Sequence, residues 1–397
     1  MARNSLYRFS SSENLSRAWE DMFNASRKNK RDGFGFDGIS INKFKENESL
    51  NIFRLSNLLR KKEYQPQLLI PHFIPKSNGK DRVICVPSVV DRLVQRALLS
   101  FLITNGYGFV NSVSYGFVKG RTVSMAAQKA IEYRKSKPWV YKADISAFFD
   151  RIDRGILTEY VKKNIRLSAL HPIMEEIINT EIYCRHDGVV KRINKMGIKE
   201  GIGLRQGMPI SPYLANLMLL EFDRSIQKKG ISMIRYADDF IVFSDSESEC
   251  YDIHKYCVEE LSRIGLDIHP IGDSDKTVIA SPSDTIEFLG LGLSKISDGY
   301  TLKVTHNQLE SIKNKIFMIG DLDYCMKNGI HISKLTERLD DMVSGYSGAY
   351  HVCSNHDQLI DVLNSARNET MTRLFVRNFG IEYKSLSMKH KKFLQIC

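Results

Sequence analysis

The spacing of apolar and polar residues separates segments that favour helices from segments that favour strands. Near the start, Leu15, Trp19 and Met22 recur at helical spacing, and residues 303–397 show the same period. Between these helical ends the apolar residues are largely β-branched or aromatic and come in short runs, which is typical of strands. The predicted strands cover residues 68–74, 82–86, 139–145 and 233–243.

The run at 233–243 predicts two short strands that fold back on each other. Ala237, Asp238 and Asp239 lie at the bend, where Asp is a common turn former. The tip would then carry two adjacent carboxylates, whose mutual repulsion is relieved when cations neutralise them. Taken alone, such a turn is more often simply solvated, so other residues must decide its role.

A third carboxylate ends another predicted strand. Asp144 lies near the carboxyl end of residues 139–145, and Phe148, Phe149 and Asp150 then begin a predicted helix. Mg²⁺ prefers oxygen ligands and takes one or two carboxylates together with substrate phosphates. Two such ions can hold the attacking and leaving oxygens of a displacement, and Asp144 with Asp238 and Asp239 could bind them.

Basic residues occur in several predicted loops. Those at the turn of the hairpin formed by residues 68–86 could hold a triphosphate, although a solubilising turn is the simpler interpretation. A loop at 114–121 mixes cations with aromatic rings, which suits nucleic acid. A basic run near the start could contact phosphates, and the basic segment 183–203 is predicted to be another hairpin. The candidates are Lys76, Lys80 and Arg82; Tyr115, Lys119 and Arg121; and Arg27, Lys28, Lys30 and Arg31.

The overall charge indicates a polyanionic partner. Lys and Arg exceed Asp and Glu by 57 to 46, a net charge of +11, which suits nucleic acid or a membrane surface. No apolar run approaches the roughly 20 residues of a membrane span, and the polar start does not resemble a secretory signal. The seven Cys are scattered without a CxxC pair, so we expect free thiols in a cytoplasmic protein.

Residues 33–295 resemble the bacterial reverse transcriptases of the group II intron and retron-like kind. Each of the shared motifs is short, but all of them occur in the order of that family. They are Phe36-Asp37-Gly38, Ile74-Pro75-Lys76 with Gly79-Lys80-Asp81-Arg82, Tyr115-Gly116-Phe117, Asp144 with Phe148-Phe149-Asp150, Gln206-Gly207 with Ser211-Pro212, Tyr236-Ala237-Asp238-Asp239, Leu266 with Lys276-Thr277, and Phe288-Leu289-Gly290.

The resemblance implies an α+β right-hand polymerase fold and the roles of particular residues. Residues 1–300 would form fingers and palm, with an N-terminal extension at 1–35, and residues 301–397 a helical thumb. Phe149, or else Phe148, would exclude a ribose 2′-hydroxyl, so that DNA is the expected product. The implied metal ligands are Asp144, Ile145, Asp238 and Asp239, the nucleotide contacts are Lys76, Lys80, Arg82, Gln206, Gly207 and Lys276, and Tyr236 joins the nucleic-acid contacts.

Departures from the family pattern narrow the subtype. Arg205 stands where proline is usual, which should leave the chemistry intact and change the pocket wall. The chain is similar to stand-alone, defence-associated enzymes, which implies two Mg²⁺ ions, deoxynucleoside triphosphates, a structured non-coding RNA template and a cDNA product in anti-phage defence. A splicing or RNA-binding factor and an RNA-templated RNA polymerase are the alternatives; clustered carboxylates argue against the first, and the bulky Phe148–Phe149 pair against the second.

Overall fold

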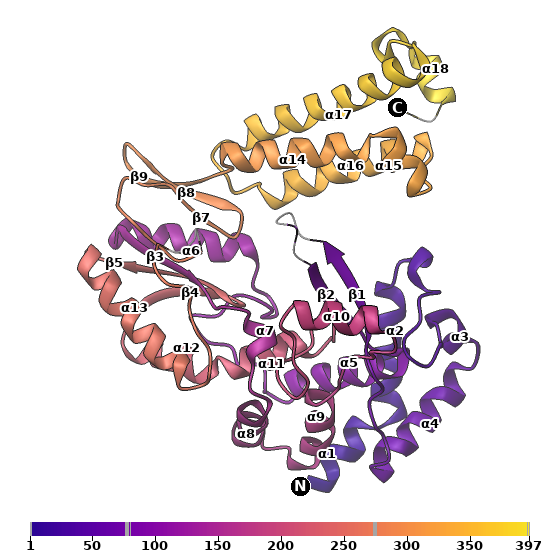
Figure 1. Cartoon of the computed structure of the whole chain (residues 1–397), viewed down its shortest axis with the longest axis vertical. Coiled ribbons are helices and arrows are strands. Elements are labelled where there is room, and N and C mark those ends of the chain that lie inside the picture. The colour runs from indigo at the N-terminus through magenta and orange to yellow at the C-terminus, as the bar shows by residue number, and fades with distance from the viewer. Residues whose placement is uncertain (1, 76–78, 80, 273–275, 395, 397) are drawn as a thin grey trace. The chain divides into compact units, whose positions relative to one another are not determined.

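The computed structural model describes every residue except 1, 76–78, 80, 273–275, 395 and 397. Helices dominate both ends of the chain and strands occupy its centre, as the apolar pattern predicts (Figure 1). No helix in the described part of the chain is both long enough and apolar enough to cross a bilayer.

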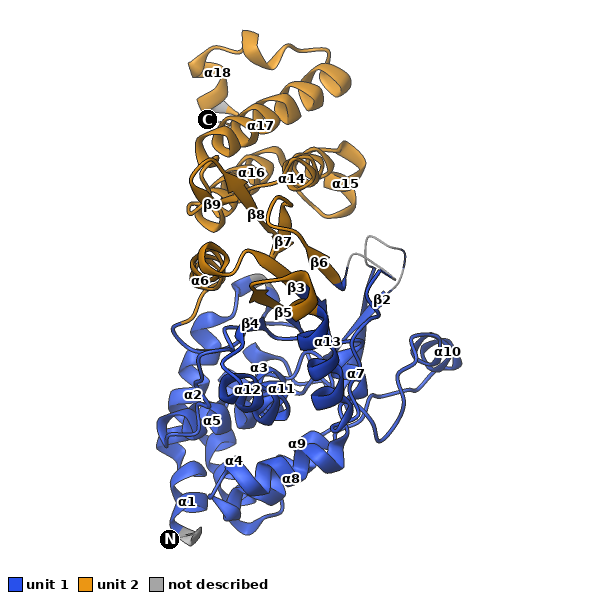
Figure 2. Ribbon diagram, turned by 90° about the vertical axis from the view of Figure 1, so that its left-hand side faces the viewer, with its two compact units in different colours: residues 1–120, 142–240, 251–277 blue, residues 121–141, 241–250, 278–397 orange. Residues whose placement is uncertain are grey.

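Two compact units make up the chain, and each is built from several sequence segments (Figure 2). Unit 1 comprises residues 1–120, 142–240 and 251–277, and unit 2 comprises residues 121–141, 241–250 and 278–397. The boundary between the units therefore does not fall at residue 300. The division of the chain into fingers, palm and thumb remains a prediction.

The N-terminal part of unit 1 is a helical cluster closed by aromatic side chains. Trp19 and Phe9 are fully buried, and the ring centroids of Trp19 and Phe44 lie 4.4 Å apart. Ser11 caps the second helix by accepting a hydrogen bond from the Asn14 N–H. The elements are α1 (Ala2–Phe9), α2 (Ser12–Ala25), η1 (Lys28–Lys30), α3 (Ile41–Glu46), α4 (Glu48–Lys61), β1 (Ile70–Pro75), β2 (Asp81–Val86) and α5 (Val89–Thr104).

The predicted hairpin at 68–86 is confirmed as β1 and β2, which pair antiparallel with Ile74 opposite Arg82. A second prediction is wrong, because the segment 183–203 contains a helix and the structure records no strand in it. Its apolar residues Val189, Val190 and Ile193 fall at helical spacing, and Ile193 is buried. Gly188 lies in the first turn of this helix, and Gly197, Gly201 and Gly203 follow its end.

The carboxylate hairpin belongs to the middle of the chain, most of which lies in unit 1; residues 139–141 of β3 and 241–250 belong to unit 2. β4 and β5 confirm the two strands predicted at 233–243, and the strand order of their sheet is β4-β5-β3-β6. The elements are β3 (Trp139–Asp144), α7 (Phe148–Arg151), α8 (Arg154–Asn164), η2 (Ser168–Leu170), α9 (His171–Ile178), α10 (Asp187–Lys195), α11 (Ser211–Met218), α12 (Leu220–Lys228), β4 (Ser232–Tyr236), β5 (Asp239–Ser244) and α13 (Glu247–Ser262).

Unit 2 places a three-stranded sheet, in the order β7-β8-β9, against one helix and continues into the C-terminal helices. Arg134 of that helix is fully buried and donates to the carbonyls of Leu293, Ser281 and Asp284 at 2.6, 3.1 and 2.7 Å. The elements are α6 (Val123–Ser136), β6 (Val278–Ala280), β7 (Ile286–Phe288), β8 (Leu291–Ile296), β9 (Gly299–Lys303), α14 (His306–Ile319), α15 (Leu322–Lys327), α16 (Ile332–Ala349), α17 (His356–Phe379), η3 (Tyr383–Ser385) and α18 (Met388–Phe393).

Candidate active site

The turn between β4 and β5 holds the adjacent carboxylates in a strained backbone. Ala237 has φ +59°, a left-handed conformation that is uncommon for residues other than glycine. Such strain persists only where the surroundings fix the conformation. Contacts on two sides of the turn do so.

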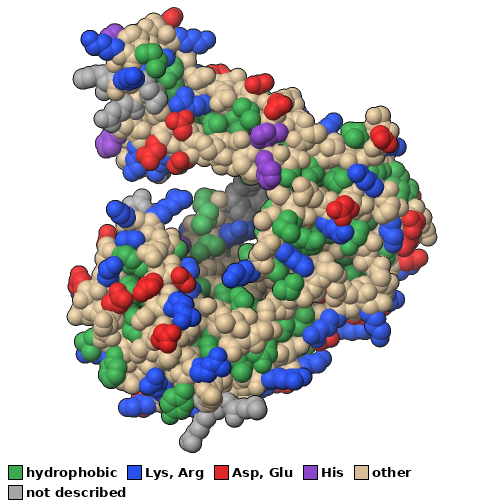
Figure 3. Space-filling view, turned by 180° about the vertical axis from the view of Figure 1, so that it is seen from behind, with side chains coloured by type: hydrophobic (Ala, Val, Ile, Leu, Met, Phe, Trp, Pro, Cys, Tyr) green, Lys and Arg blue, Asp and Glu red, His purple; other side chains and the backbone are tan. Residues whose placement is uncertain are grey.

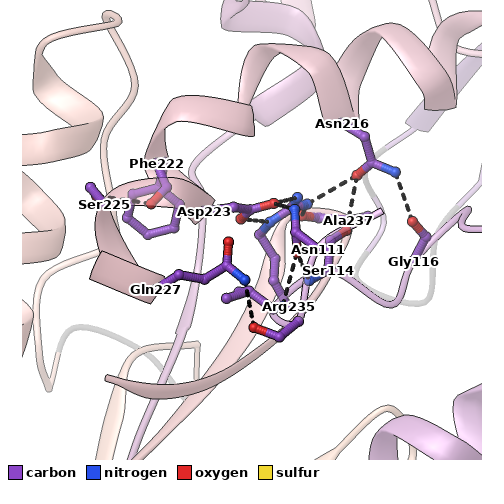
Figure 4. A network of polar contacts seen from close by, with 12 residues as sticks. Asn111, Ser114, Gly116, Asn216, Phe222, Asp223, Ser225, Gln227, Arg235 and Ala237 are labelled. Atoms are coloured by element: carbon purple, nitrogen blue, oxygen red, sulfur yellow. Dashed lines mark hydrogen bonds and ion pairs between the residues drawn. The ribbon is translucent and has the colours of Figure 1, made fainter. Parts of the chain in front are cut away.

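A buried ion pair supports the turn from one side (Figure 4). Arg235 and Asp223 are both fully buried, and their two hydrogen bonds measure 2.7 and 2.5 Å. The same guanidinium donates to the Ala237 carbonyl at 2.9 Å and to the Asn216 side-chain oxygen at 3.1 Å. Asn111 donates to the second Asp223 oxygen at 2.8 Å. The network therefore fixes the carbonyl of the residue that precedes Asp238.

A glycine loop lies against the other side of the turn. The Tyr115 N–H donates to the Arg235 carbonyl at 2.7 Å, and Asn216 donates to the Gly116 carbonyl at 2.8 Å. A Cβ on Gly116 would lie only 2.5 Å from the Ala237 nitrogen. Glycine is required at this position because a larger residue would displace the turn.

The third carboxylate reaches the turn through β3. The Ile145 N–H donates to the Asp238 carbonyl at 3.0 Å, which places Asp144 beside the pair. Because the Ile145 side chain is fully buried, only its backbone could reach a cation. Burial raises the pKa of Asp238, and the negative charge of Asp144 raises it further. The three predicted carboxylates thus come from β3 and one turn.

Burial changes the pKa of Asp239 more than that of Asp238. Burial raises the pKa of the Asp239 carboxyl to about 7, although Lys142 acts in the opposite direction. Its Oδ1 atom is buried and has no hydrogen-bond partner among the described residues. A buried carboxylate oxygen without a partner is costly and is commonly satisfied by a cation or water.

One cavity of about 760 Å³ brings together many of the predicted nucleotide contacts. Its walls include Asp144, Asp238 and Phe149, with Arg82 and Lys276 supplying positive charge. The Lys276 ammonium lies 3.3 Å from an Asp144 oxygen. Phe148 and Gln206 also line this cavity. Lys76 and Lys80 lie outside the described residues.

The loop before α11 is fixed against β2 and α7. The Gln206 carbonyl accepts from the Cys85 N–H at 2.6 Å, and a Cβ on Gly207 would lie 2.5 Å from the Cys85 carbonyl. Gly207 therefore does not line the cavity as expected; it allows the loop to approach β2. A Cβ on Gly203 would lie 2.7 Å from the Asp150 carbonyl, so Gly203 allows the same close approach to α7.

Arg205 does not form the pocket wall that its replacement of proline suggested. Its guanidinium is buried and pairs with Glu181 at 2.6 Å, and Arg154 pairs with the other Glu181 oxygen at 2.6 Å. Burial raises the pKa of Glu181, but hydrogen bonds from the Gly201 N–H and both arginines hold it below its usual range. The substitution thus introduces a buried ion cluster behind the loop.

The predicted nucleic-acid contacts are spread over several elements. Tyr115 and Tyr236 are half-buried beside the carboxylate turn, and Lys119 is exposed. Arg121 lies in unit 2, whereas the others belong to unit 1.

The basic run at the start of the chain is only partly available to a ligand. Arg27, Lys28 and Lys30 are exposed around η1. Arg31 is half-buried over the Phe23 ring and donates to the Phe23 carbonyl at 3.0 Å. Arg31 therefore supports the local fold, and three cations of this run remain on the surface.

Several residues of the cavity wall were not predicted as site residues, and Arg192, Lys195, Met196 and His269 are among them. Arg192, Lys195 and Met196 come from α10 and the residue after it, and His269 lies 3.4 Å from the Lys276 ammonium. The signal that could have found the first three is the helical spacing of apolar residues in 187–195. A hairpin interpretation of that segment hid it.

The chain belongs to the reverse transcriptase (RNA-dependent DNA polymerase) family, whose model matches residues 74–293. Its class is therefore that of an RNA-directed DNA polymerase, a nucleotidyltransferase. Membership confirms the α+β right-hand polymerase fold predicted from the motifs.

Known relatives include proteins of both kinds named by the resemblance. Protein YkfC of Escherichia coli is 26% identical over 64% of this chain and 74% of its own length. The retron Mx65 reverse transcriptase of Myxococcus xanthus is 23% identical over 52% of this chain and 48% of its own. The group II intron-encoded protein LtrA of Lactococcus lactis is 26% identical over 48% of this chain and 29% of its own. The chain therefore aligns with less than half the length of the last two.

We predict that Gly116→Ala disturbs the carboxylate turn. The added Cβ overlaps the Ala237 backbone, and such overpacking typically costs about 1–3 kcal/mol. The free energy of unfolding, measured with urea, should fall by that amount, and nucleotide incorporation should fall with it. Gly108→Ala is the matched control, because its nearest atom would be 3.8 Å away. Equal stability and activity of the two variants would contradict the role given to Gly116.

Proposed function

We propose that this chain copies an RNA template into DNA by adding deoxynucleoside triphosphates to a primer. One observation carries the proposal. Residues as far apart in the sequence as Arg82, Asp144, Gln206, Asp238 and Lys276 line a single cavity. The cavity, which Phe149 also lines, thus combines carboxylates, a bulky aromatic residue and cations, a set that suits phosphoryl transfer from a nucleotide.

The carboxylates fit a hard divalent cation. No group of three Asp, Glu, His or Cys side chains within the described ranges forms a ready-made metal cage. Mg²⁺ does not need one, since it commonly uses one or two carboxylates and completes its shell with substrate phosphates and water. Asp144 and Asp238, with the buried Oδ1 atom of Asp239, would hold two Mg²⁺ ions. Bound there, the ions would neutralise charge on the reacting phosphate and on its attacking and leaving oxygens.

The protein cations act on the triphosphate itself. Incorporation joins the primer 3′-oxygen to the α-phosphorus and releases pyrophosphate. Arg82 on β2 would bind the triphosphate oxygens, and Lys276 would lie near the leaving pyrophosphate. Fixed positive charges aimed at developing negative charge lower the barrier without further reorganisation.

We predict that Asp238→Asn abolishes incorporation while the fold is retained. Asn keeps the size of the side chain and removes the charge that binds the cation, so loss of about 10³-fold or more is expected. Primer extension on an RNA template measures the activity, and circular dichroism checks the fold. Asp252→Asn on the exposed surface of α13 is the matched control. Substantial extension by Asp238→Asn with Mg²⁺ present would refute the active site.

The cavity also indicates how the sugar is selected. Phe148 is only 2% exposed, whereas its neighbour Phe149 is partly exposed, and both line the cavity. Their ring centroids are 5.4 Å apart. An exposed ring can contact the sugar of an incoming nucleotide, and a buried ring supports it from behind. This supports Phe149 over Phe148 as the residue that excludes the 2′-hydroxyl.

We predict that Phe149→Ala narrows the preference for deoxynucleotides over ribonucleotides at least about tenfold, with little loss of stability. Phe148→Ala should instead destabilise the protein by about 3–5 kcal/mol, because it leaves a cavity in the core. The ratio of kcat/KM for the two kinds of nucleotide and a denaturant titration measure these effects. If both variants keep the parent's discrimination, a different residue selects the sugar.

The finer part of the proposal concerns the template. We infer a dedicated, structured non-coding RNA and a role in anti-phage defence, following the resemblance to stand-alone bacterial enzymes. Lys and Arg side chains lie at many separate points of the face in Figure 3, with Asp and Glu among them. Such dispersed charge supplies affinity with little sequence information.

Specificity for one RNA would need unpaired bases stacked on exposed aromatic rings. Three exposed rings could stack on such bases: Tyr7, Phe34 and Phe36, whose exposed fractions are 55%, 62% and 43%. Phe9 and Trp19 in the same part of the chain are buried in the core and cannot stack on a base. The alternative of a splicing or RNA-binding factor is supported by the likeness to a group II intron-encoded protein; such a factor would function unchanged with Asp238→Asn.

We predict that neutralising Arg27, Lys28 and Lys30 together lowers the salt dependence of RNA binding. Each lost phosphate contact should reduce the slope of log K against log salt by about 0.7 to 0.9. Arg31 is left intact because it supports Phe23, and Lys255→Ala on exposed α13 serves as the control. Crosslinking in cells followed by sequencing identifies the RNA. A broad spread over cellular transcripts would contradict a dedicated partner.

A further inference from the structure

Helix α10 forms an edge of unit 1 and is joined to the rest of the unit by a loop at each end (Figure 2). The helix is amphipathic, and Ile193 is its one buried residue, so few apolar contacts hold the helix in place. Other interactions must fix its position beside the cavity.

Arg192 provides that anchor. Its Nε atom lies 2.5 Å from an Asp81 oxygen at the start of β2, and its guanidinium lies over the Phe73 ring of β1 at 4.2 Å. Its hydrogen bond holds the pKa of Asp81 below the usual range. One side chain thus joins α10 to both strands of the hairpin that carries Arg82.

Lys195 lies on the same face of α10 as Arg192, because residues three apart are neighbours on a helix. Both line the nucleotide cavity. Two of the four cavity cations are already paired, Arg192 with Asp81 and Lys276 with Asp144. Among the described residues, no side-chain hydrogen bond or ion pair holds Arg82 or Lys195, although the charge of Lys195 also helps to lower the pKa of Asp81. These two cations are therefore available to a ligand.

We propose that Lys195 is a second binding residue for the triphosphate of the incoming nucleotide, positioned by the Arg192 anchor. The inference rests on the proposed function, because it assigns the cavity to a nucleoside triphosphate. Lys195 is the last residue of α10, where a positive charge also interacts favourably with the helix dipole. That interaction alone does not account for its position in the cavity wall. Lys191 on the same helix supplies the comparison, since it is exposed and lies outside the cavity lining.

Binding of deoxythymidine triphosphate tests the proposal without incorporation. The protein is saturated with an RNA template annealed to a primer that ends in a dideoxynucleotide, and nucleotide affinity is measured by equilibrium titration. Lys195→Ala should weaken triphosphate binding about tenfold, as expected for a lost charge-assisted contact. It should leave deoxythymidine monophosphate binding and the melting temperature unchanged. Lys195→Arg should restore most of the affinity, and Lys191→Ala should match the parent.

The outcomes separate this inference from the proposed function. Unchanged triphosphate affinity in Lys195→Ala, or an equal loss for the monophosphate, overturns the role of Lys195. Failure of the parent to bind the triphosphate overturns it as well. If the parent binds the triphosphate in a Lys195-dependent way but does not extend an unblocked primer, the binding site stands and the polymerase function fails.

Discussion

The buried pair of Arg235 and Asp223 is the interaction on which the site depends. Two charges inside a protein are tolerated only when each is paired and hydrogen-bonded, and removal of one partner typically costs about 3–5 kcal/mol. Here the Arg235 guanidinium also donates a hydrogen bond to the Ala237 carbonyl at 2.9 Å. The strained turn therefore supplies one of the acceptors that the buried positive charge needs. The same contact stabilises the pair and orients the backbone before Asp238. The need to pair a buried arginine thus also fixes the position of the turn that carries Asp238.

A second buried ion cluster lies behind the loop that carries Gln206. Glu181 is shared by Arg154 and Arg205, and its Oε1 atom accepts from the Gly201 N–H at 2.8 Å. These contacts hold the loop that leads to Gln206. The Cys85 N–H donates to the Gln206 carbonyl and so holds this residue against β2. Buried polar networks thus fix the positions of the residues proposed to contact the nucleotide. Hydrogen bonds are directional, whereas apolar packing is not, so such networks define positions more sharply.

Close backbone approach is the other recurring constraint. At Gly116, Gly203 and Gly207 an added Cβ would lie within 2.7 Å of a neighbouring backbone atom. In each case the glycine loop meets a segment that bears cavity residues. Because glycine has no side chain at these points, the backbones can approach closely, and residues from distant segments can line one cavity.

The sequence by itself determined the strands at 68–86, 139–145 and 233–243 and the carboxylates carried by the last two, because alternation and turn chemistry are local properties. Motif order also determined the family, with Asp144, Asp238 and Arg82 as candidate site residues. Only the tertiary structure decided that the helix at 187–195 lies beside β1 and β2, because the contacts of Arg192 with Asp81 and Phe73 join segments far apart in the sequence. It likewise decided that Phe148 is buried while Phe149 is partly exposed, although both line the cavity, and that Arg205 and Arg31 are bound within the fold. Burial and pairing depend on residues far away in the sequence, which no local pattern records.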